Sequence, residues 1–384
     1  MQLDFHYYAT YCAAILAGYS HEESSAICYS TQFVDLCSES LLKKLGAPKA
    51  AATTQLSMEM ADARTDLLGL QNITRIWASF HFLPYDLYAE KKGVSRRYRS
   101  KYRLICRPNG SLVEDTVRLA KGAALQAAGL AMHVLADTWA HSNFAGTPSL
   151  VINNTNYHFY ELLPDGTERP IKFSHNPSGP DDLENGVFTN SIFQMNENSV
   201  MNLGHGRAGH LPDYSFMRYK YLPAWDGYRE LVKDNPSDYL YAFCQMIEAL
   251  KFLRGERESF EKERYDFDSI AGLEDEIRDI LTVRRLDACD AWKALGERLS
   301  GCEIEDFDLE KYQREYREAK ESEKNDSFLG KFFLAALAQK SMVTNKIFQS
   351  GNMLAGFSVN FWEKGFRGMK DFRELVEQGR RERP

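Results

Sequence analysis

The chain has 384 residues, of which 44% are hydrophobic and 26% charged, and its formal net charge is −7 with a pI of about 5.8. This composition is ordinary for a soluble globular protein, and the length suffices for one large domain or two of average size. The acidic balance argues against an electrostatic nucleic-acid binder, because such proteins carry an excess of Lys and Arg to neutralise phosphates.

The sequence shows no targeting or membrane-spanning segment. The N-terminus lacks the basic and apolar regions of a secretory signal, and no apolar run approaches the roughly 20 residues needed to cross a bilayer. The seven cysteines are scattered and form no C-x-x-C motif, a pattern typical of reduced thiols in the cytosol. We therefore expect a cytoplasmic protein without a transmembrane segment.

The first 45 residues are predicted to form a helical hairpin. Residues 5–18 are rich in Tyr, Ala and Leu and end at Gly18, which is typical of a helix C-terminus. Ser20 and Glu23 match a capping box that opens a second helix, running to about residue 45. Because the connection between the two helices is so short, they should lie antiparallel.

This hairpin should bring the first histidine of the chain close to a carboxylate. His6 and Asp35 lie at comparable separations from the turn at Tyr19, and a rise of about 1.5 Å per residue puts both roughly 20–24 Å from it. The hairpin can thus bring His6 and Asp4 near Asp35, whose mostly apolar neighbours leave its carboxylate in need of a partner. Taken alone, Asp35 fits an exposed helix residue equally well.

The next segment contains an isolated histidine between two connections. Residues 46–56 predict a loop and residues 57–69 a short helix, and His81 follows in an aromatic, apolar segment that ends at Pro84. Taken alone, such a histidine is usually structural. Residues 90–110 form a basic, irregular connection, which is best interpreted as a solvated loop. Its tyrosines leave open a role in binding phosphate-bearing substrates, but the chain carries no strong nucleic-acid signature.

The strongest chemical signal lies at the end of a long helix predicted to begin near residue 114. His133, Asp137 and His141 recur at i, i+4 and i+8, and about 100° per residue places them within roughly 80° on one helical face. Two imidazoles and a carboxylate aligned there, among Ala and Leu, are suited to bind a metal ion. For each residue taken singly, a structural or capping role is the more common one, but the spacing of all three favours metal.

From residue 146 to about 225 the helical periodicity disappears, and Pro, Gly and Asn become common. Alternating residues on both sides of a Pro-Asp-Gly turn at 164–166 predict a small β-hairpin within this loop insertion. We interpret His158 and His175, which lie in the hairpin and a loop, as surface residues.

A second cluster of metal-binding residue types closes this insertion. His205, His210 and Asp213 lie within nine residues and are interleaved with glycines, which let the backbone and ligands approach closely. A simple turn would not need the histidines. We therefore predict metal binding here, with His210 and Asp213 preferred over His205.

The remainder of the chain is predicted to be helical. Helices are expected over 239–254, 273–298, 308–323, 328–340 and 359–379. Because no histidine follows His210, this half should be scaffold, lid or interaction surface. We expect a metal-binding helical domain over residues 1–235 and a helical C-terminal region over 236–384, packed on it or forming a lid.

The candidate ligands occur in a recognisable order along the chain. In sequence they are His6, Asp35, His81, His133, Asp137, His141, His205, His210 and Asp213. This order resembles the zinc-dependent phospholipase C and S1/P1 nuclease superfamily over roughly residues 1–215. The segment Ser79-Phe-His81-Phe-Leu-Pro84 is similar to the family's ligand-bearing turn, and His133-x-x-x-Asp137 is similar to its central motif. Residues 133–144 most resemble the variant in fungal heterokaryon-incompatibility (Het-C) proteins and their bacterial relatives.

The resemblance implies an all-α, multi-helix bundle that holds two or three zinc ions, or other divalent metals. Its first ion would be bound by Asp35, His81, His133 and Asp137. The second would be bound by His6 and a bridging Asp137, with Asp4 or a backbone group, and the third by His141, His210 and Asp213, with His205 in reserve.

The chain departs from the family pattern in three places. Its last motif histidine, His141, lies four rather than six residues after Asp137. The family uses a processed N-terminal amine and carbonyl as ligands, whereas this chain starts at Met1 without a signal. The third ligand group also lacks the usual His-x-x-x-Asp/Glu spacing.

Two functions of different classes follow from the resemblance. The first is a metal-dependent phosphoesterase that hydrolyses a small-molecule phosphodiester or a phospholipid by a metal-activated water. Asp137 would bridge two metals, and Asp35 or Asp4 would accept the proton of the water. The alternative is a non-catalytic, metal-stapled helical protein with a regulatory or interaction role, as in Het-C. An open coordination position would distinguish them, because structural zinc is closed.

Overall fold

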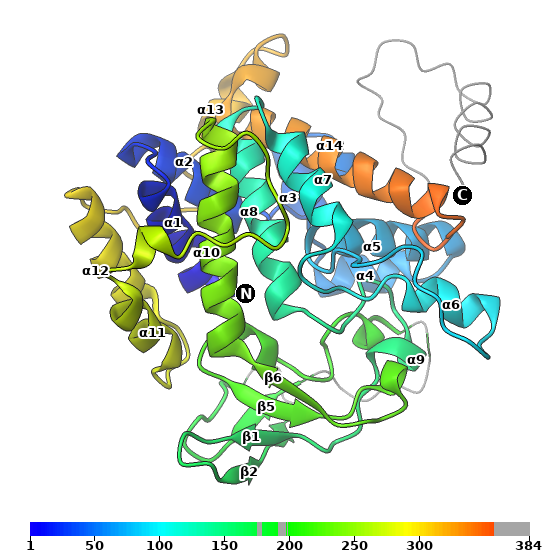
Figure 1. Cartoon of the computed structure of the whole chain (residues 1–384). Helices are drawn as coiled ribbons and strands as arrows, with labels where there is room; N and C mark the ends of the chain where they lie inside the picture. The colour runs from blue at the N-terminus through cyan, green and yellow to red at the C-terminus, as the bar shows by residue number, and fades with distance from the viewer. Residues whose placement is uncertain (175–178, 191–196, 198, 357–384) are drawn as a thin grey trace.

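The structure is a computed structural model that describes all residues except 175–178, 191–196, 198 and 357–384 (Figure 1). It is mostly helical. Its α-helices are α1 (Thr10–Leu16), α2 (His21–Phe33), α3 (Glu39–Leu45), α4 (Ser57–Ala63), α5 (Leu67–Phe80), α6 (Arg96–Tyr102), α7 (Ser111–Ala120), α8 (Leu125–Ala140), α9 (Leu150–Asn153), α10 (Asn235–Arg254), α11 (Glu274–Thr282), α12 (Cys289–Ser300), α13 (Gln313–Glu318) and α14 (Phe328–Gln349). A π-helix, Asp4–Ala9, precedes α1.

A small sheet lies at one end of the helical bundle (Figure 1). Its strands are β1 (Tyr160–Leu162), β2 (Glu168–Pro170), β5 (Arg218–Tyr221) and β6 (Leu231–Asp234), all antiparallel in the order β2-β1-β5-β6. A separate parallel pair is formed by β3 (Lys172–Ser174) and β4 (Val187–Thr189). The predicted β-hairpin is confirmed as β1–β2, whereas β5 and β6 were not anticipated.

Helix α8 is the centre of the bundle, and α2, α7, α10 and α14 pack around it (Figure 1). Nearly all of its residues are buried, because these four helices pack around it. At Gly129 the backbone of α8 lies so close to α2 that an added Cβ would be 2.3 Å from the Ile27 carbonyl oxygen. The Thr31 hydroxyl of α2 donates to the Gly129 carbonyl at 2.8 Å. This close packing sets α2 directly against the helix that carries the histidine ladder.

The helical hairpin and its capping box are confirmed, but several predicted helices are interrupted. The Ser20 side chain accepts from the Glu23 backbone N–H, and the Glu23 carboxylate accepts from the Ser20 N–H. The second helix ends at Phe33 rather than near residue 45, and Asp35 lies in the break before α3. The physical reason is the side chain of Thr53, whose hydroxyl donates to the Val34 carbonyl at 2.6 Å.

Other segments that were predicted as single helices are also interrupted. The long helix expected from residue 114 is two helices, α7 and α8, separated at Gly122, whose φ of +74° cannot continue a helix. The basic connection 90–110 contains α6, and the segment 273–298 is divided into α11 and α12. The helix expected over 359–379 falls outside the described residues.

The two halves of the chain share one hydrophobic core. Tyr239 of α10 and Trp292 of α12 contact the ring of Phe5 edge-on, at centroid distances of 4.9 and 6.2 Å. Leu329 and Phe332 of α14 belong to the same buried cluster. The C-terminal helices therefore support the first helices of the chain directly.

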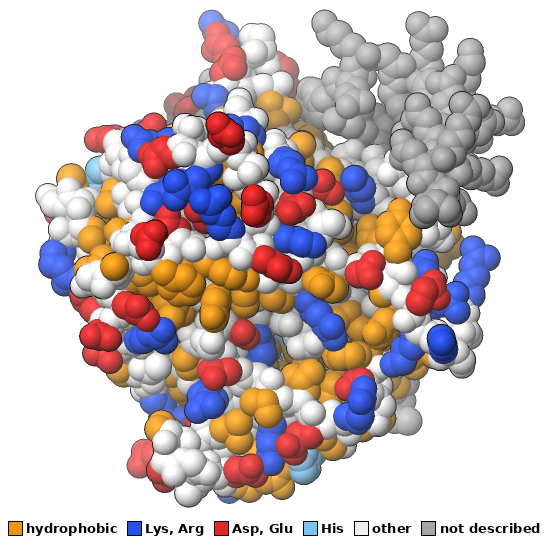
Figure 2. Space-filling view, viewed as in Figure 1, with side chains coloured by type: hydrophobic (Ala, Val, Ile, Leu, Met, Phe, Trp, Pro, Cys, Tyr) orange, Lys and Arg blue, Asp and Glu red, His pale blue; other side chains and the backbone are white. Residues whose placement is uncertain are grey.

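The surface agrees with the modest net charge of the chain. On the face drawn in Figure 2, acidic and basic side chains are interspersed and no large field of one sign forms. Among the described residues, no helix is both long and apolar enough to cross a membrane.

Candidate metal centre

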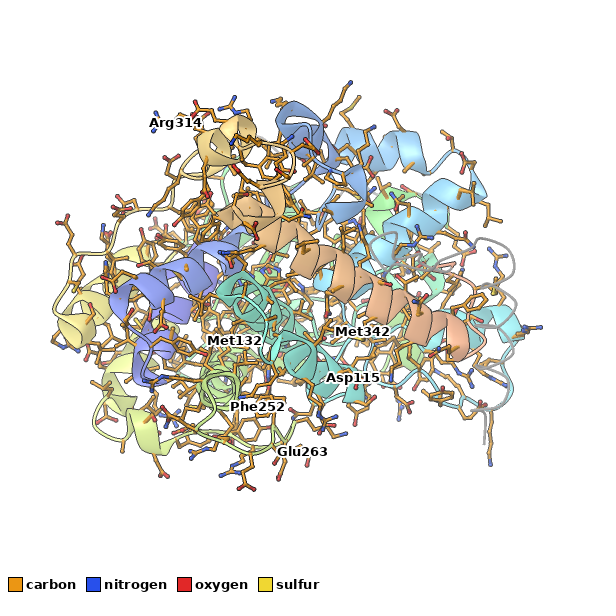
Figure 3. The ribbon with its side chains drawn as sticks, turned by 90° about the horizontal axis from the view of Figure 1, so that it is seen from above. Asp115, Met132, Phe252, Glu263, Arg314 and Met342 are labelled. Atoms are coloured by element: carbon orange, nitrogen blue, oxygen red, sulfur yellow. The ribbon has the colours of Figure 1, made fainter. Side chains whose placement is uncertain are left out.

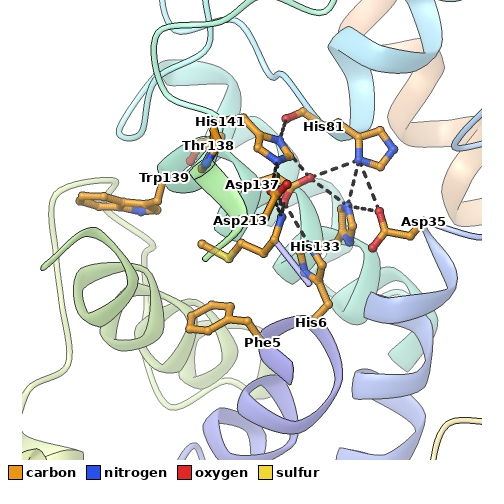
Figure 4. Close-up of polar contacts among 12 residues, drawn as sticks. Phe5, His6, Asp35, His81, His133, Asp137, Thr138, Trp139, His141 and Asp213 are labelled. Atoms are coloured by element: carbon orange, nitrogen blue, oxygen red, sulfur yellow. Dashed lines mark hydrogen bonds and ion pairs between the residues drawn. The ribbon is translucent and has the colours of Figure 1, made fainter. Parts of the chain in front are cut away.

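Eight of the predicted ligands converge on the C-terminal half of α8 and form three groups that could each hold a metal ion. All of them except His205 are labelled in Figure 4. The ligand atoms within each group all lie within 4.8 Å of one another. The first group is Asp35, His81 and His133, the second is His6, His133 and Asp137, and the third is His141, His205 and Asp213. The ligands come from the end of α2, the end of α5, α8, the π-helix and the loop before β5, so the fold assembles them from distant parts of the sequence.

The first group has the dimensions of a tetrahedral metal site. The distance from His81 Nδ1 to His133 Nε2 is 3.2 Å, and Asp137 Oδ2 lies 3.2 Å and 3.1 Å from these two nitrogens. Asp35 Oδ1 lies 3.8 Å from both. Zinc bonds of about 2.0–2.1 Å at tetrahedral angles separate neighbouring ligand atoms by roughly 3.3 Å. The three shorter edges therefore match one face of a zinc tetrahedron.

Hydrogen bonds fix which nitrogens face the centre of this group. His133 Nδ1 lies 2.9 Å from the Thr31 carbonyl oxygen and His81 Nε2 lies 3.1 Å from that of Thr53. Because a carbonyl oxygen only accepts, each of these nitrogens must carry the proton. In neutral imidazoles the opposing lone pairs of His81 Nδ1 and His133 Nε2 then face each other. Either a metal ion between them or a second proton on one ring makes this arrangement favourable.

The second group places a fully buried histidine against Asp137. His6 Nε2 lies 3.1 Å from Asp137 Oδ1, and its ring stacks on that of His133 with centroids 3.9 Å apart. Neither ring nitrogen of His6 makes a hydrogen bond of good geometry. Burial lowers the pKa of His6 to about 4, so the imidazole is neutral and free to bind a metal at pH 7. The π-helix that carries His6 is a conformation found frequently at functional sites.

Asp137 connects the first and second groups through its two oxygens. Oδ2 faces His81 and His133, and Oδ1 faces His6. The side chain is only 1% exposed. Burial raises the pKa of this carboxyl, but the surrounding imidazoles and the Met1 ammonium outweigh that effect and hold it well below its usual range. Asp137 is therefore an ionised, bridging carboxylate.

The amino group of Met1 lies inside the centre and was not anticipated from the sequence. It is 3.0 Å from Asp137 Oδ1, 3.3 Å from Asp213 Oδ1 and 3.4 Å from His141 Nε2. Burial alone would lower the pKa of this amino group, but attraction to Asp137, Asp213 and Asp35 raises it to about 11. The sequence did offer one signal for this position of Met1. His6 is a predicted ligand only five residues after Met1, so the first residues must lie close to the metal centre.

The third group combines one residue of α8 with two from the loop before β5. His141 Nδ1 donates to the His81 carbonyl at 2.8 Å, which leaves Nε2 free at 3.2 Å from Asp213 Oδ1. His205 Nδ1 donates to the Gly209 carbonyl at 2.8 Å, and its Nε2 lies 3.8 Å from Asp213 Oδ2. Burial lowers the pKa of His205 to about 4, so this imidazole is neutral at pH 7. Both histidines therefore direct Nε2 toward Asp213.

His205, and not His210, completes the third group. His210 Nδ1 lies 3.5 Å from Asp213 Oδ2, but its side chain is 58% exposed and lies outside the group. The reason is local: His210 precedes the short 3-10 helix Leu211–Asp213, and its ring projects to the surface. The expected preference for His210 is thus reversed. His158 is a surface residue as predicted, whereas His175 lies outside the described residues.

Asp4 does not join the centre, contrary to the expectation from the sequence. Its Oδ1 accepts from the Phe5 backbone N–H at 2.8 Å, and its Oδ2 accepts from that of Ala288 at 2.9 Å. Asp4 therefore ties the π-helix to the start of α12. Both oxygens accept from backbone donors, and Asp4 belongs to none of the three groups.

The centre is most accessible beside Asp35. This side chain is 31% exposed and that of His205 is 19% exposed, whereas the ligands of the second group are nearly or completely buried. Phe82 covers part of the third group, with its ring stacked on His141 at 4.8 Å. A ligand from solvent would therefore approach the first group past Asp35.

Comparison with known proteins identifies a family without an assigned activity. A family model described as a family of unknown function (DUF6765) matches residues 1–347, a span that contains every ligand of the three groups. No curated protein and no solved structure matches the chain.

Proposed function

The chain belongs to this family of unknown function (DUF6765), and we propose from its metal centre that it is a metal-dependent phosphoesterase. The proposed substrate is a phosphodiester or a phospholipid, and the proposed cofactor is two or three zinc ions. The order of the ligands along the chain is the one that the resemblance to zinc-dependent phospholipases C and S1/P1 nucleases implies, with His205 in place of His210 in the third group. The Met1 amino group adds support, because that superfamily uses its N-terminal amine as a ligand.

The observation that carries the proposal is the pair of facing lone pairs in the first group. His81 Nδ1 and His133 Nε2 are 3.2 Å apart, each with its proton committed to a backbone carbonyl on the other side of the ring. A hydrogen bond between them would require one ring to be protonated at both nitrogens. A metal ion satisfies both lone pairs and the Asp137 oxygen beside them at once.

The residue types favour zinc among the common metals. Each group offers two imidazoles and at least one carboxylate, and zinc prefers this mixture of nitrogen and oxygen ligands. Magnesium and calcium prefer sites built from oxygen ligands alone. The other transition metals that accept imidazole remain alternatives for the binding assay.

The chain's own residues supply the remaining chemistry. Adjacent divalent ions lower the pKa of a water and neutralise charge on phosphoryl oxygens. Asp137 holds the first and second groups together. Asp35 is the ligand next to solvent, so its carboxylate is the one placed to accept a proton from an attacking water. His6, His133 and Asp137 of the buried second group would hold a further ion, whose positive charge would be shielded from solvent.

The proposed function predicts metal-dependent hydrolysis of phosphodiester or phospholipid substrates. Protein loaded with Zn²⁺, Mn²⁺ or Ni²⁺ is expected to hydrolyse at least one of bis-p-nitrophenyl phosphate, phosphatidylcholine vesicles and single-stranded DNA, and to lose that activity with EDTA. Asp35→Asn should lower kcat by about 10²–10⁴-fold with little change in KM, as for loss of a general base. His158→Asn, at an exposed histidine outside the centre, is the matched control. No turnover of any substrate with any metal would contradict the proposal.

A free amino group at Met1 is a second requirement of the proposal. Extending the chain by Gly-Ser before Met1 converts the amine to an amide and forces new atoms into a position that is 0% exposed. We expect metal affinity to fall at least tenfold and the metal-free protein to lose roughly 3–5 kcal/mol, because buried carboxylates lose their cation. Calorimetric metal titration and thermal unfolding measure the two effects. The extended protein after proteolytic removal of Gly-Ser is the control, and identical behaviour before and after removal would contradict the expectation.

A non-catalytic role is the second candidate, and the burial of the second group favours it. His6 and His133 are fully buried and Asp137 nearly so, as in a closed structural site. In that case the metals would staple the π-helix to α8, and a regulatory or interaction role, as the Het-C resemblance suggests, would replace hydrolysis. Metal-dependent folding without turnover of any tested substrate would support this alternative.

A further inference from the structure

Helix α14, far from the ligands in sequence, reaches the metal centre through two buried polar residues. Figure 3 shows α14, which carries Met342, beside α7, which carries Asp115, and α14 also packs against α5 and α8. Gln339 and Lys340 of α14 are 1% and 5% exposed. Because consecutive helical residues point about 100° apart, the two side chains leave the helix in different directions.

Gln339 contacts the backbone that leads into His81. Its Nε2 donates to the Ser79 carbonyl at 3.2 Å and to the Thr116 hydroxyl at 2.9 Å. Ser79 belongs to the last turn of α5, and His81 follows as its C-cap. Both donor hydrogens of the amide are therefore used to hold the end of α5 against α7 and α14.

Lys340 contacts the segment that accepts the ring proton of His81. Its Nζ donates to the Ala52 carbonyl at 2.9 Å. The next carbonyl along the chain, that of Thr53, accepts from His81 Nε2. Residues 51–55, which we call the strap, also bind the Asp35 turn, since Thr53 N donates to the Cys37 carbonyl at 2.9 Å. The strap is thus fixed to α14 on one side and to the first group on the other.

Burying the Lys340 amino group costs free energy that a purely structural residue would not need to cost. Among the described residues no carboxylate forms an ion pair with it, and burial lowers its pKa to about 7. Buried lysines without a charged partner are rare, and replacing a buried charge with an apolar side chain of similar size is often neutral or stabilising. What an apolar residue could not supply at this position is a donor for the Ala52 carbonyl.

We propose that Gln339 and Lys340 are positioning residues of the first group: Gln339 holds the backbone of α5 two residues before His81, and Lys340 holds the strap whose Thr53 carbonyl accepts from His81 Nε2. Together these contacts direct His81 Nδ1 toward His133 and Asp137. The Thr53 carbonyl is the direct hydrogen-bond partner of His81, and such a partner sets the orientation and metal affinity of a ligand. Lys340 and Gln339 act through it and through the end of α5. The inference rests on the metal centre of the proposed function and does not require that the centre hydrolyse anything.

The test compares metal affinity with stability in Lys340→Met, which keeps the apolar stem and removes the donor. Co²⁺ is titrated into the full-length, metal-free chain, and its visible absorption and a competing chelator report each binding step. We expect one class of sites to weaken by about 10–100-fold with a changed Co²⁺ spectrum, while the Tm of the metal-free protein stays equal or rises. Lys346→Met, at an exposed lysine of the same helix, should change neither quantity.

A double variant identifies which site is affected. Asp35→Asn removes a ligand that belongs only to the first group, so Lys340→Met should add little further loss of affinity in the Asp35→Asn background. Gln339→Met is measured in parallel, and it decides the question if Lys340→Met does not fold. Unchanged affinity in both α14 variants, or equal weakening of all sites together with a lower metal-free Tm, would overturn the inference. If wild type binds metal but shows no turnover, only the proposed activity fails; if it binds no metal, both fail.

Discussion

Asp137→Asn is expected to remove the metals of the first and second groups together and to abolish any hydrolysis. One carboxylate faces both groups, with Oδ2 beside His81 and His133 and Oδ1 beside His6. An amide offers one weaker oxygen ligand instead of two charged ones. We expect metal content measured by elemental analysis to fall to at most one equivalent, and turnover to fall by about 10³-fold or more.

The same substitution should also destabilise the metal-free protein. Asp137 is the buried counter-charge of the Met1 ammonium, and removing one partner of a buried pair costs about 3–5 kcal/mol. Asp213→Asn is the matched comparison, because its carboxylate belongs only to the third group and should cost only that group its metal. Retention of two or more equivalents of metal in Asp137→Asn would contradict the bridging role.

The ligands carried by regular helices could be predicted from the sequence. His133, Asp137 and His141 lie on one helix, so their relative positions follow from helical geometry alone. The antiparallel hairpin brought the segments that carry His6 and Asp35 to the same end of the bundle, because its turn is short and its cap is explicit. His6 itself lies on the π-helix and Asp35 just beyond the end of α2. In both cases local periodicity and a recognisable terminus decide where a side chain goes.

The parts that were mispredicted depend on tertiary contacts with no local signature. Asp4 was expected in the centre, but two backbone donors, one from Ala288, take both its oxygens. The choice between His205 and His210 depends on a 3-10 turn whose side-chain directions the glycine-rich sequence does not indicate. Asp35 leaves its helix because Thr53 binds the Val34 carbonyl. Each outcome is set by a hydrogen bond between residues distant in sequence or by one irregular turn.

The Met1 ammonium is placed to balance the buried carboxylates of the centre. Its ammonium lies between the carboxylates of Asp137 and Asp213, and the pKa of His133 is raised because its acidic neighbours outweigh the effect of burial. Protons on nitrogen can thus balance part of the negative charge when no metal is present. The metal-free chain should therefore remain folded but be weakened, and metal must displace protons to bind.

Chelation is expected to lower the stability of the native protein substantially. A ligand that binds only the folded state stabilises it by about 4 kcal/mol when its free concentration is a thousand times its Kd. Two such ions would contribute roughly 8 kcal/mol, which for a chain of this size corresponds to a Tm difference of about 10 °C. The ligands come from segments as distant as His6 and Asp213, so each ion joins parts of the chain that would otherwise separate on unfolding.

The measurement is thermal unfolding of the protein as purified, after EDTA, and after EDTA followed by added Zn²⁺. Recovery of the original Tm with zinc separates loss of metal from irreversible damage. Cys106→Ala is a control for loss of stability without loss of metal, because this buried thiol lies outside all three groups. The variant should be less stable than wild type but show the same EDTA-induced shift in Tm. A Tm that is indifferent to EDTA, in protein with less than half an equivalent of metal, would mean that the facing lone pairs of His81 and His133 are resolved by a proton. The centre would then be a buried polar network rather than a metal site.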